Sequence, residues 1–413
     1  MRCYTALLGS GVLVATLAAC GSSSTASGGS GGGSTDPGVD VSSKTVTIGA
    51  SVQKTGPAAS FYPDIESAKA AFQYVNDHGG VNGWKIKFDE LDDAYDPTRA
   101  AANAKELVDQ DGVFAVVDNA GTSTTMAMLP YLEAKNVPAI GIIAETGILK
   151  GNNSNYGIFG TQPAYAYTAA FMTDFIKDGL KQTHLSLAYQ DDTSGAAVVP
   201  GATWGAQHNG LTIDTKVAIP GTATDYSGYA SRLKAANSPV VLLWGTPTQV
   251  EGVIRDANTI GYHPKWVLPF HIIDKTIYDN LGDLVNGLYF DSWFDPTSAS
   301  AGLNEAKAEI KKYAGIAEPT PLDITGWVDA QEFIHALDVA TSGGKTPTRA
   351  ALTAALEGSS FDPGNVGAEL QFTHGDHVGK GITDRIVTSS GLGQYKTVFG
   401  PRQDPNVPDS LIQ

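Results

Sequence analysis

Runs of apolar residues typical of buried strands alternate with segments of helical periodicity, and this alternation occurs twice along the chain. The strand-like runs span residues 44–52, 85–91, 113–119 and 138–143 in the first half and 184–190, 212–219, 240–244 and 266–270 in the second. Strands separated in this way by helices pair in parallel, with helices on both faces of the sheet. The sequence therefore predicts an α/β protein built from two similar halves.

The order of the elements also indicates where each half begins and ends. We expect the first half to comprise residues 44–161 and, after the chain returns to it, about 291–368. The second half is then 162–290 together with about 369–395, which leaves 396–413 as a C-terminal tail.

The third run of the first half leads into a loop suited to binding an anion. Val113 to Asn119 opens with five apolar residues in a row, which indicates a strand buried on both faces. The residues from Ala120 to Thr125 are small or hydroxylic, so Thr122 and Ser123 are expected at a helix N-terminus, where free N–H groups favour negative charge. Without Lys, Arg or a Gly-x-Gly-x-x-Gly pattern, the loop suits a carboxylate better than a pyrophosphate. Capping of the helix by one of these hydroxyls is equally compatible with the pattern.

The overall charge limits the kinds of molecule that the protein can bind. The chain has 27 basic and 43 acidic residues, a net charge of −16, and no cluster of Lys or Arg. Nucleic-acid binding needs a basic surface and is therefore excluded. The two cysteines, Cys3 and Cys20, both lie in the first twenty residues, so the body of the chain can form neither an internal disulfide nor a cysteine-ligated metal site.

The first twenty residues have the features of an export signal. Arg2 is followed by an apolar run from Leu7 to Ala19, which is too short to span a bilayer. The run ends in Leu17-Ala18-Ala19-Cys20-Gly21, which resembles the lipobox of bacterial lipoproteins, cleaved before a cysteine that is then acylated. Residues 21–43 are rich in Gly and Ser and are expected to form a flexible tether. We therefore expect an extracytoplasmic protein held at the outer face of the cell membrane through lipidated Cys20.

No motif of the sequence supports a catalytic site or a resident cofactor. Asp192 to Gly195 is a faint match to an aspartic-protease signature, but the required second copy is missing. His374 to His377 could offer metal ligands, although Gly375 and the short spacing favour a solvated turn between two strands. There is no phosphate-binding loop, nucleophile elbow or His-Glu-x-x-His motif. We expect a protein that is not an enzyme and that has neither a cofactor nor a metal.

Five short segments in a fixed order carry a resemblance to a known family. They are Thr55 to Pro57, His78 to Gly83, Asp92 to Pro97, Ala104 to Val108 and Asp225 to Lys234. From about Lys44 to Tyr395 the chain resembles type I periplasmic solute-binding proteins, in particular the leucine/isoleucine/valine-binding branch that serves ABC importers. The resemblance implies two Rossmann-like lobes, each a parallel sheet flanked by helices, joined by a hinge of three crossovers. Family members often have a disulfide between the loops at Tyr95 and Gly121, and both cysteines are missing here.

The resemblance also implies a set of ligand-binding residues in the cleft between the lobes. It places Thr122 and Ser123 on the ligand carboxylate, with the Ala144 carbonyl and the Thr146 amide and hydroxyl beside the same group. Phe61 or Tyr62 would cover the ligand from the first lobe, while Tyr165, Ser194 and Thr246 would face it from the second. For each of these residues a purely structural role remains open, and we expect Trp244 to belong to the sheet core.

One departure from the family bears on the ligand. In the amino-acid binders, a carboxylate in a strand-end loop of the second lobe pairs with the ligand ammonium. The corresponding residues here, Leu268 to Ile273, contain no acid, and a buried ammonium without a counterion is costly. Glu145 or Asp191 could supply one. Otherwise the ligand is an acid or amide without the ammonium group, and His271 could contact one of its polar groups.

The function that the resemblance implies is that of a monomeric, lipid-anchored receptor of an ABC importer. It would bind a small carboxylate-bearing solute, such as a branched-chain amino acid or an aromatic or aliphatic acid, between two closing lobes and present it to the permease and ATPase subunits. Two alternatives remain open at this point: a sensory ligand-binding protein with the same fold, and an α/β enzyme that uses the cleft for catalysis.

Overall fold

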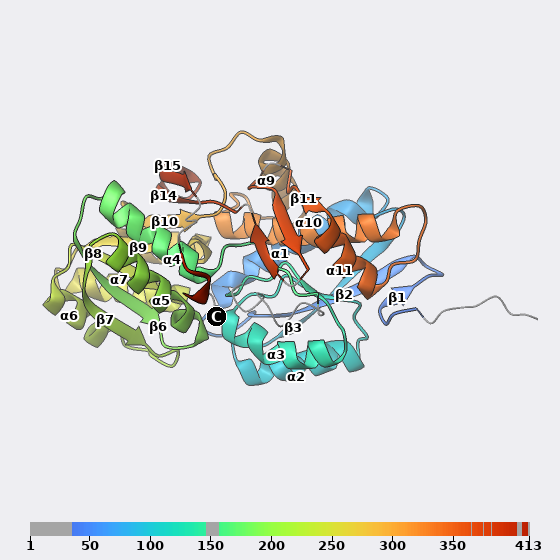
Figure 1. Cartoon of the computed structure of the whole chain (residues 1–413), viewed down its shortest axis with the longest axis horizontal. Helices are drawn as coiled ribbons and strands as arrows, with labels where there is room; N and C mark the ends of the chain where they lie inside the picture. Colours follow the sequence, from blue (N-terminus) through green and yellow to red (C-terminus); the bar gives the residue numbers. More distant parts are fainter. Residues whose placement is uncertain are drawn as a thin grey trace, which may run out of the picture. The chain divides into compact units, whose positions relative to one another are not determined.

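The first of two parallel sheets is built almost entirely from the N-terminal part of the chain (Figure 1). In the computed structural model, which describes residues 35–145, 157–364, 366–374, 376–380, 382–402 and 407–411, β2 (Thr45–Val52) pairs in parallel with β3 (Lys85–Asp92) and with β4 (Val116–Val117). Strand β5 (Ala139–Ile140) extends the sheet beside β4, and the short β1 (Val39–Asp40) pairs antiparallel with β2. The predicted strands are confirmed, although β4 and β5 are shorter than their apolar runs.

Helices cover both faces of this sheet. Helices α2 (Pro97–Asp109) and α3 (Thr122–Ala134) pack together, while α1 (Tyr62–Asp77) packs against α9 (Ala301–Tyr313) and α10 (Pro321–Thr341). Figure 1 shows orange α10 and α11 (Arg349–Gly358) on the same side as α1, far from it in sequence. In the sequence, Asp96 followed by Pro97 predicts a helix start, and the structure confirms it: the Asp96 carboxylate accepts hydrogen bonds from the backbone N–H groups of Thr98 and Arg99.

The second sheet has seven strands in the order β15-β14-β10-β9-β8-β6-β7. Its parallel part comprises β6 (His184–Gln190), β7 (Thr212–Ile219), β8 (Val240–Trp244), β9 (Lys265–Leu268) and β10 (Tyr289–Ser292). It is accompanied by α4 (Tyr165–Asp174), α5 (Thr193–His208), α6 (Ser227–Ala236), α7 (Pro247–Thr259) and α8 (Lys275–Leu281). The expected architecture of two α/β lobes is confirmed.

The last part of the chain differs from the expected boundaries. Strands β11 (Ser360–Phe361), β12 (Leu370–Thr373) and β13 (Asp376–Lys380) form a small antiparallel sheet. Leu370, Phe372 and Ile382 belong to the core of the first lobe. The chain joins the second sheet only at β14 (Asp384–Gly391) and β15 (Gln394–Arg402), later than residue 369, so residues 396–402 are not a free tail.

The turn between β12 and β13 is a hairpin, as expected, but it is not fully solvated. His377 is 1% exposed, and its ring stacks on Phe159 at a centroid distance of 4.2 Å. Its Nε2 lies 2.8 Å from Glu357 Oε1, and its Nδ1 lies 2.9 Å from the Ile158 carbonyl oxygen. The alternation of apolar residues predicted these strands correctly, but it could not indicate which core they join.

The chain passes between the two lobes three times. It leaves the first lobe at Thr161 and Gln162 before α4, returns after β10 toward α9, and crosses again between Ile382 and β14. Among the described residues, no helix is both long enough and apolar enough to cross a membrane.

Four carboxyl groups lie completely buried in the core of the first lobe. Asp64 of α1, Asp118 after β4, and Asp329 and Glu332 of α10 each have no exposed surface. Burial and the neighbouring carboxyl groups raise the pKa values of Asp64 and Asp118 well above their usual range, and burial raises that of Asp329 to about 7. Because no Lys or Arg is buried among the described residues, this cluster has to hold protons to remain neutral.

This cluster predicts an unusual pH dependence of stability. The native-state pKa values lie above those of the unfolded chain, so between about pH 4 and pH 7 the native state holds protons that the unfolded state has released. The free energy of unfolding should therefore be highest below pH 4 with respect to these groups and should fall as the pH rises toward 7.

We expect Asp118→Asn to be more stable than the parent protein at pH 8, by about 1–2 kcal/mol, and less dependent on pH. Asn is nearly isosteric and tolerates the left-handed backbone of residue 118, whose φ is 58°. Urea unfolding at pH 5 and pH 8 measures the difference, with the exposed Asp111→Asn as the control. An unchanged pH slope in the Asp118 variant would contradict this view of the cluster.

Candidate ligand-binding site

A cavity lies where the two lobes meet, at the carboxyl ends of the parallel strands. Its walls are formed by Phe61, Tyr95, Ala120, Gly121, Thr122, Ile143 and Leu322 from the first lobe and by Tyr165, Gln190, Ser194 and His271 from the second. Ligands in open parallel sheets bind at this edge, because the loops that leave the strands converge there. The cavity volume is about 20 Å³, so a larger guest requires the lobes to separate and close again around it.

The N-terminus of α3 opens toward this cavity without a side-chain cap. Its N-cap residue is Gly121, no side chain of the described residues accepts a hydrogen bond from the first turn, and the first turn contains no acidic residue. The Thr122 hydroxyl oxygen accepts a hydrogen bond from the backbone N–H of Glu145 at 3.0 Å, which turns it away from a capping role. Of the two possibilities left open by the sequence, capping by Thr122 or Ser123 is thus not observed, and the helix end retains its attraction for an anion.

Two neighbouring helix N-termini, those of α5 and α4, are in contrast each served by a carboxylate of the protein. Asp192 Oδ1 accepts from the backbone N–H groups of Ser194 and Gly195 at the start of α5, at 2.9 and 3.3 Å. Glu145 is 6% exposed, and its Oε2 accepts from the Tyr165 N–H at the start of α4 at 2.9 Å. Of the acids considered as partners for a ligand ammonium, Glu145 therefore serves a helix, and Asp191 is exposed outside the cavity lining.

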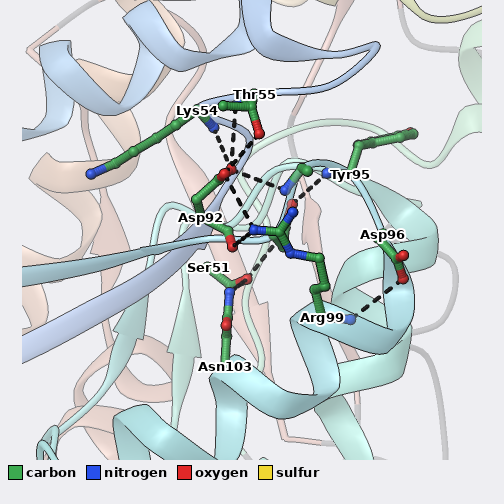
Figure 2. A network of polar contacts seen from close by, with 10 residues as sticks. Ser51, Lys54, Thr55, Asp92, Tyr95, Asp96, Arg99 and Asn103 are labelled. Carbon is green, nitrogen blue, oxygen red and sulfur yellow. Dashed lines mark hydrogen bonds and ion pairs between the residues drawn. The ribbon is translucent and has the colours of Figure 1, made fainter.

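Tyr95 is held in the cavity wall by a loop with a demanding backbone conformation. Ala94 and Tyr95 both have positive φ values, 53° and 62°, in the left-handed region that non-glycine residues seldom adopt. Figure 2 shows the network that supports this loop: Asp92 accepts from the Ala94 N–H at 3.0 Å and from the Thr55 hydroxyl at 2.7 Å. Asp93 Oδ1 accepts from the Tyr95 N–H at 2.7 Å.

The ring of Tyr95 lies directly against Gly121. A Cβ atom at Gly121 would lie 2.7 Å from Tyr95 Cε2 and 2.7 Å from the Thr124 hydroxyl, and the φ of Gly121 is 102°. These are the two loops that the family often joins by a disulfide. Here an aromatic ring packed on a glycine brings the same loops together.

Aromatic rings form much of the remaining wall. The His271 ring meets Phe61 edge-on at a centroid distance of 5.6 Å and Trp244 at 5.4 Å, and Trp244 contacts Tyr165 at 4.7 Å. Trp244 itself is 1% exposed and donates its Nε1–H to the Ser194 hydroxyl at 3.1 Å, so it supports the wall from behind. Burial lowers the pKa of His271 to about 4, which makes the imidazole neutral at physiological pH.

Direct hydrogen bonds link the two lobes around the cavity. The Ser123 hydroxyl donates to Asp192 Oδ2 at 2.9 Å and lies 2.7 Å from the Thr193 hydroxyl. Gln190 Nε2 donates to the Tyr95 hydroxyl at 3.2 Å, and the Thr248 hydroxyl donates to the Pro57 carbonyl at 2.8 Å. These contacts exist only when the lobes are together.

The structure brings five of the expected residues into the cavity lining and leaves the others outside it. Phe61, Thr122, Tyr165, Ser194 and His271 line the cavity. Of the remainder, Ser123 bridges the lobes, Glu145 serves α4, Tyr62 donates to Glu90 at 2.9 Å, the Ala144 carbonyl accepts from Gln162, and Thr246 caps α7. Thr146 lies outside the described residues.

Sequence reasoning missed six lining residues, which are Tyr95, Ala120, Gly121, Ile143, Gln190 and Leu322. Gln190 and Ile143 are the last residues of their predicted strands, so the strand-end rule could have found them. Leu322 lies in α10, far along the chain, and no local pattern connects it to the cavity.

The lining residues that the structure describes include no Asp, Glu, Lys or Arg. Among the described residues, no group of three or more His, Cys, Asp or Glu side chains could hold a metal ion. Hydroxyl groups, an amide, a neutral imidazole and a helix N-terminus make up the polar part of the wall. This arrangement can bind one negative group and an apolar body, whereas it offers no counterion for a positive charge.

Comparison with known proteins agrees with this geometry. The family described as "Periplasmic binding protein" matches residues 45–382. An amino acid binding protein of Pseudomonas aeruginosa is 26% identical over 315 residues, which cover 74% of this chain and 81% of that protein. The Leu/Ile/Val-binding protein homolog 8 of Brucella abortus is 25% identical over 291 residues, which cover 66% and 72%.

Solved structures show the same fold. A fatty acid ABC transporter substrate-binding protein from Thermomonospora curvata has a TM-score of 0.80 at 19% identity and covers 90% of this chain and 95% of that one. A solute-binding protein from R. palustris in complex with benzoate has a TM-score of 0.76 at 15% identity and covers 87% and 98%. The chain therefore belongs to the periplasmic binding protein family, as a type I member similar to leucine/isoleucine/valine-binding proteins.

Proposed function

We propose that this protein captures a small, partly apolar carboxylate between its two lobes and delivers it to the permease of an ABC importer. The observation that carries the proposal is the uncapped N-terminus of α3, which opens with Gly121 and Thr122 into the cavity. Backbone N–H groups at such an end bind an anion without a charged side chain. Phe61, Ile143 and Leu322 provide an apolar surface for the rest of the solute.

We further propose that this solute lacks an ammonium group. None of the described lining residues is a carboxylate, and Glu145 and Asp192 already accept hydrogen bonds from helix N-termini. A desolvated ammonium without a counterion is costly. The relatives include an amino acid binding protein and a solute-binding protein solved in complex with benzoate. The neutral wall of this chain favours a benzoate-like acid without an ammonium group over a branched-chain amino acid.

Binding is proposed to act by closing the lobes. The solute contacts both walls only in the closed arrangement, so it stabilises that arrangement by its difference in affinity. The hydrogen bonds from Ser123 to Asp192 and from Gln190 to Tyr95 contribute to the same state. The permease would then recognise a monomeric receptor in its closed form.

Thr122→Val should weaken binding of a carboxylate about 10- to 100-fold, because a hydrogen bond to a charged group contributes about 1.5–3 kcal/mol. Valine keeps the shape of the side chain but leaves the Glu145 N–H without its acceptor, so the thermal unfolding of the variant is measured as well to show that it is folded. Isothermal titration with phenylacetate measures the effect, and the exposed Thr259→Val of α7 is the matched control. Equal affinities of the variant and the parent protein would place the carboxylate elsewhere.

Tyr95→Phe removes the hydroxyl that accepts from Gln190 but keeps the ring that packs on Gly121. We expect a 3- to 10-fold loss of affinity from one neutral hydrogen bond across the lobes. Small-angle scattering with and without phenylacetate should show a smaller closed fraction at subsaturating ligand. Tyr131→Phe, which removes a hydroxyl on the exposed side of α3, serves as the control.

The proposed location is the outer face of the cell membrane, with Cys20 as the lipid-bearing residue. Residues 1–34 lie outside the described part, so this proposal depends on the lipobox-like sequence before Cys20. In the precursor, Cys20→Ala should abolish labelling by a fatty-acid analogue and move the protein from the membrane to the soluble fraction. Cys3→Ala should change neither result, and a membrane-bound Cys20→Ala protein would contradict the anchor.

A further inference from the structure

His271 places a polar atom in the cavity wall that the protein leaves unsatisfied. The residue follows β9 in a short helical turn, Phe270 to Ile272, and is 8% exposed. Its Nδ1 is buried without a hydrogen-bond partner among the described residues, although the side chain lines the cavity. A buried polar atom without a partner is destabilising, so a partner supplied by the solute would favour binding.

Whether Nδ1 donates or accepts a hydrogen bond depends on which of the two ring nitrogens carries the hydrogen. The Gly245 backbone acts against burial and raises the pKa of the ring, as a carbonyl acceptor does, so we assign the donated hydrogen to the ring. Because Nδ1 has no partner, Nε2 carries that hydrogen. In a neutral imidazole only one nitrogen is protonated, so Nδ1 is an acceptor.

The surroundings of the His271 ring favour its neutral form. Phe61, Trp244 and Phe270 contact it edge-on at centroid distances of 5.4–5.6 Å. The other lining residues within the described ranges are all uncharged. A second proton on the ring would bring a positive charge into this apolar surrounding without a counterion, which is unfavourable.

We infer that the solute carries, besides its carboxylate, a neutral hydrogen-bond donor, a hydroxyl or an amide N–H, that pairs with His271 Nδ1. This inference rests on the proposed function, since it assigns a second group to the same solute. A carboxylate at this position would meet an acceptor and be repelled. An ammonium could donate a hydrogen bond, but the neutral ring offers no charge to compensate its desolvation.

Two matched series of acids test the inference by changing a single substituent. The aliphatic series is 4-methylpentanoate, 2-hydroxy-4-methylpentanoate and leucine, and the aromatic series is phenylacetate, mandelate and phenylglycine. Within each series the α-carbon bears hydrogen, a hydroxyl or an ammonium. By isothermal titration at pH 7 we expect the hydroxy acid to bind about tenfold more tightly than the unsubstituted acid in at least one series. The amino acid should bind more weakly than the hydroxy acid.

Variants of His271 then assign the preference to the ring nitrogen. His271→Phe keeps an aromatic ring and removes the acceptor, so it should lose the tenfold preference while it still binds the unsubstituted acid. His271→Gln offers an amide oxygen and should retain part of the preference, which also guards against misfolding of the phenylalanine variant. His271→Glu introduces a carboxylate and should shift the preference toward leucine or phenylglycine.

The outcomes separate this inference from the proposed function. If the unsubstituted and hydroxy acids bind equally, or if His271→Phe keeps the preference, the inference is overturned while the carboxylate site stands. If leucine binds more tightly than its hydroxy analogue, the inference is overturned together with the exclusion of an ammonium. If none of the six acids binds, the proposed carboxylate site fails and the inference fails with it.

Discussion

The cavity wall carries no unpaired charge, and this neutrality determines what it can bind. The carboxylates nearest to it are occupied by protein donors: Asp192 by the first turn of α5 and Glu145 by the first N–H of α4. In the described part of the chain, the first turn of α3 has no such partner. One helix end is thus left electrostatically unsatisfied next to an otherwise neutral wall, which favours a single negative group and disfavours any second charge.

The same need for neutrality explains the core behind the wall. Asp64 lies one turn after Phe61 on α1, and Asp118 lies two residues before Ala120. The elements that form the first-lobe wall therefore contain carboxyl groups that stay neutral by holding protons rather than by pairing with Lys or Arg. Close packing of α10 against α1 leaves no room for a cation, since a Cβ atom at Gly326 would lie 2.1 Å from the Asp64 carbonyl oxygen.

Much of the fold followed from local patterns in the sequence. The alternation of apolar runs and amphipathic segments predicted both sheets, and Asp96 with Pro97 predicted the start of α2. The assignment of β12 and β13 to a lobe could not be predicted, because alternation indicates a strand and not its partner. The site was partly predictable from the ends of the strands, since Thr122 and Ser194 follow strands directly. The position of Tyr95 depends on two left-handed residues, and that of Leu322 depends on the return of the chain to the first lobe, and neither is visible in a local pattern.

Because the wall is neutral, the His271 ring is neutral as well, with one nitrogen as a hydrogen-bond donor and the other as an acceptor. The acceptor determines which group of the solute can bind there. A charged side chain at the same place would attract many groups of opposite charge over a range of positions, since Coulombic attraction depends weakly on direction. A hydrogen-bond acceptor requires a donor at about 3 Å and in line with its lone pair. A receptor that replaces an ion pair by such a contact can discriminate between acids of equal charge, because an analogue without the donor leaves the acceptor unsatisfied.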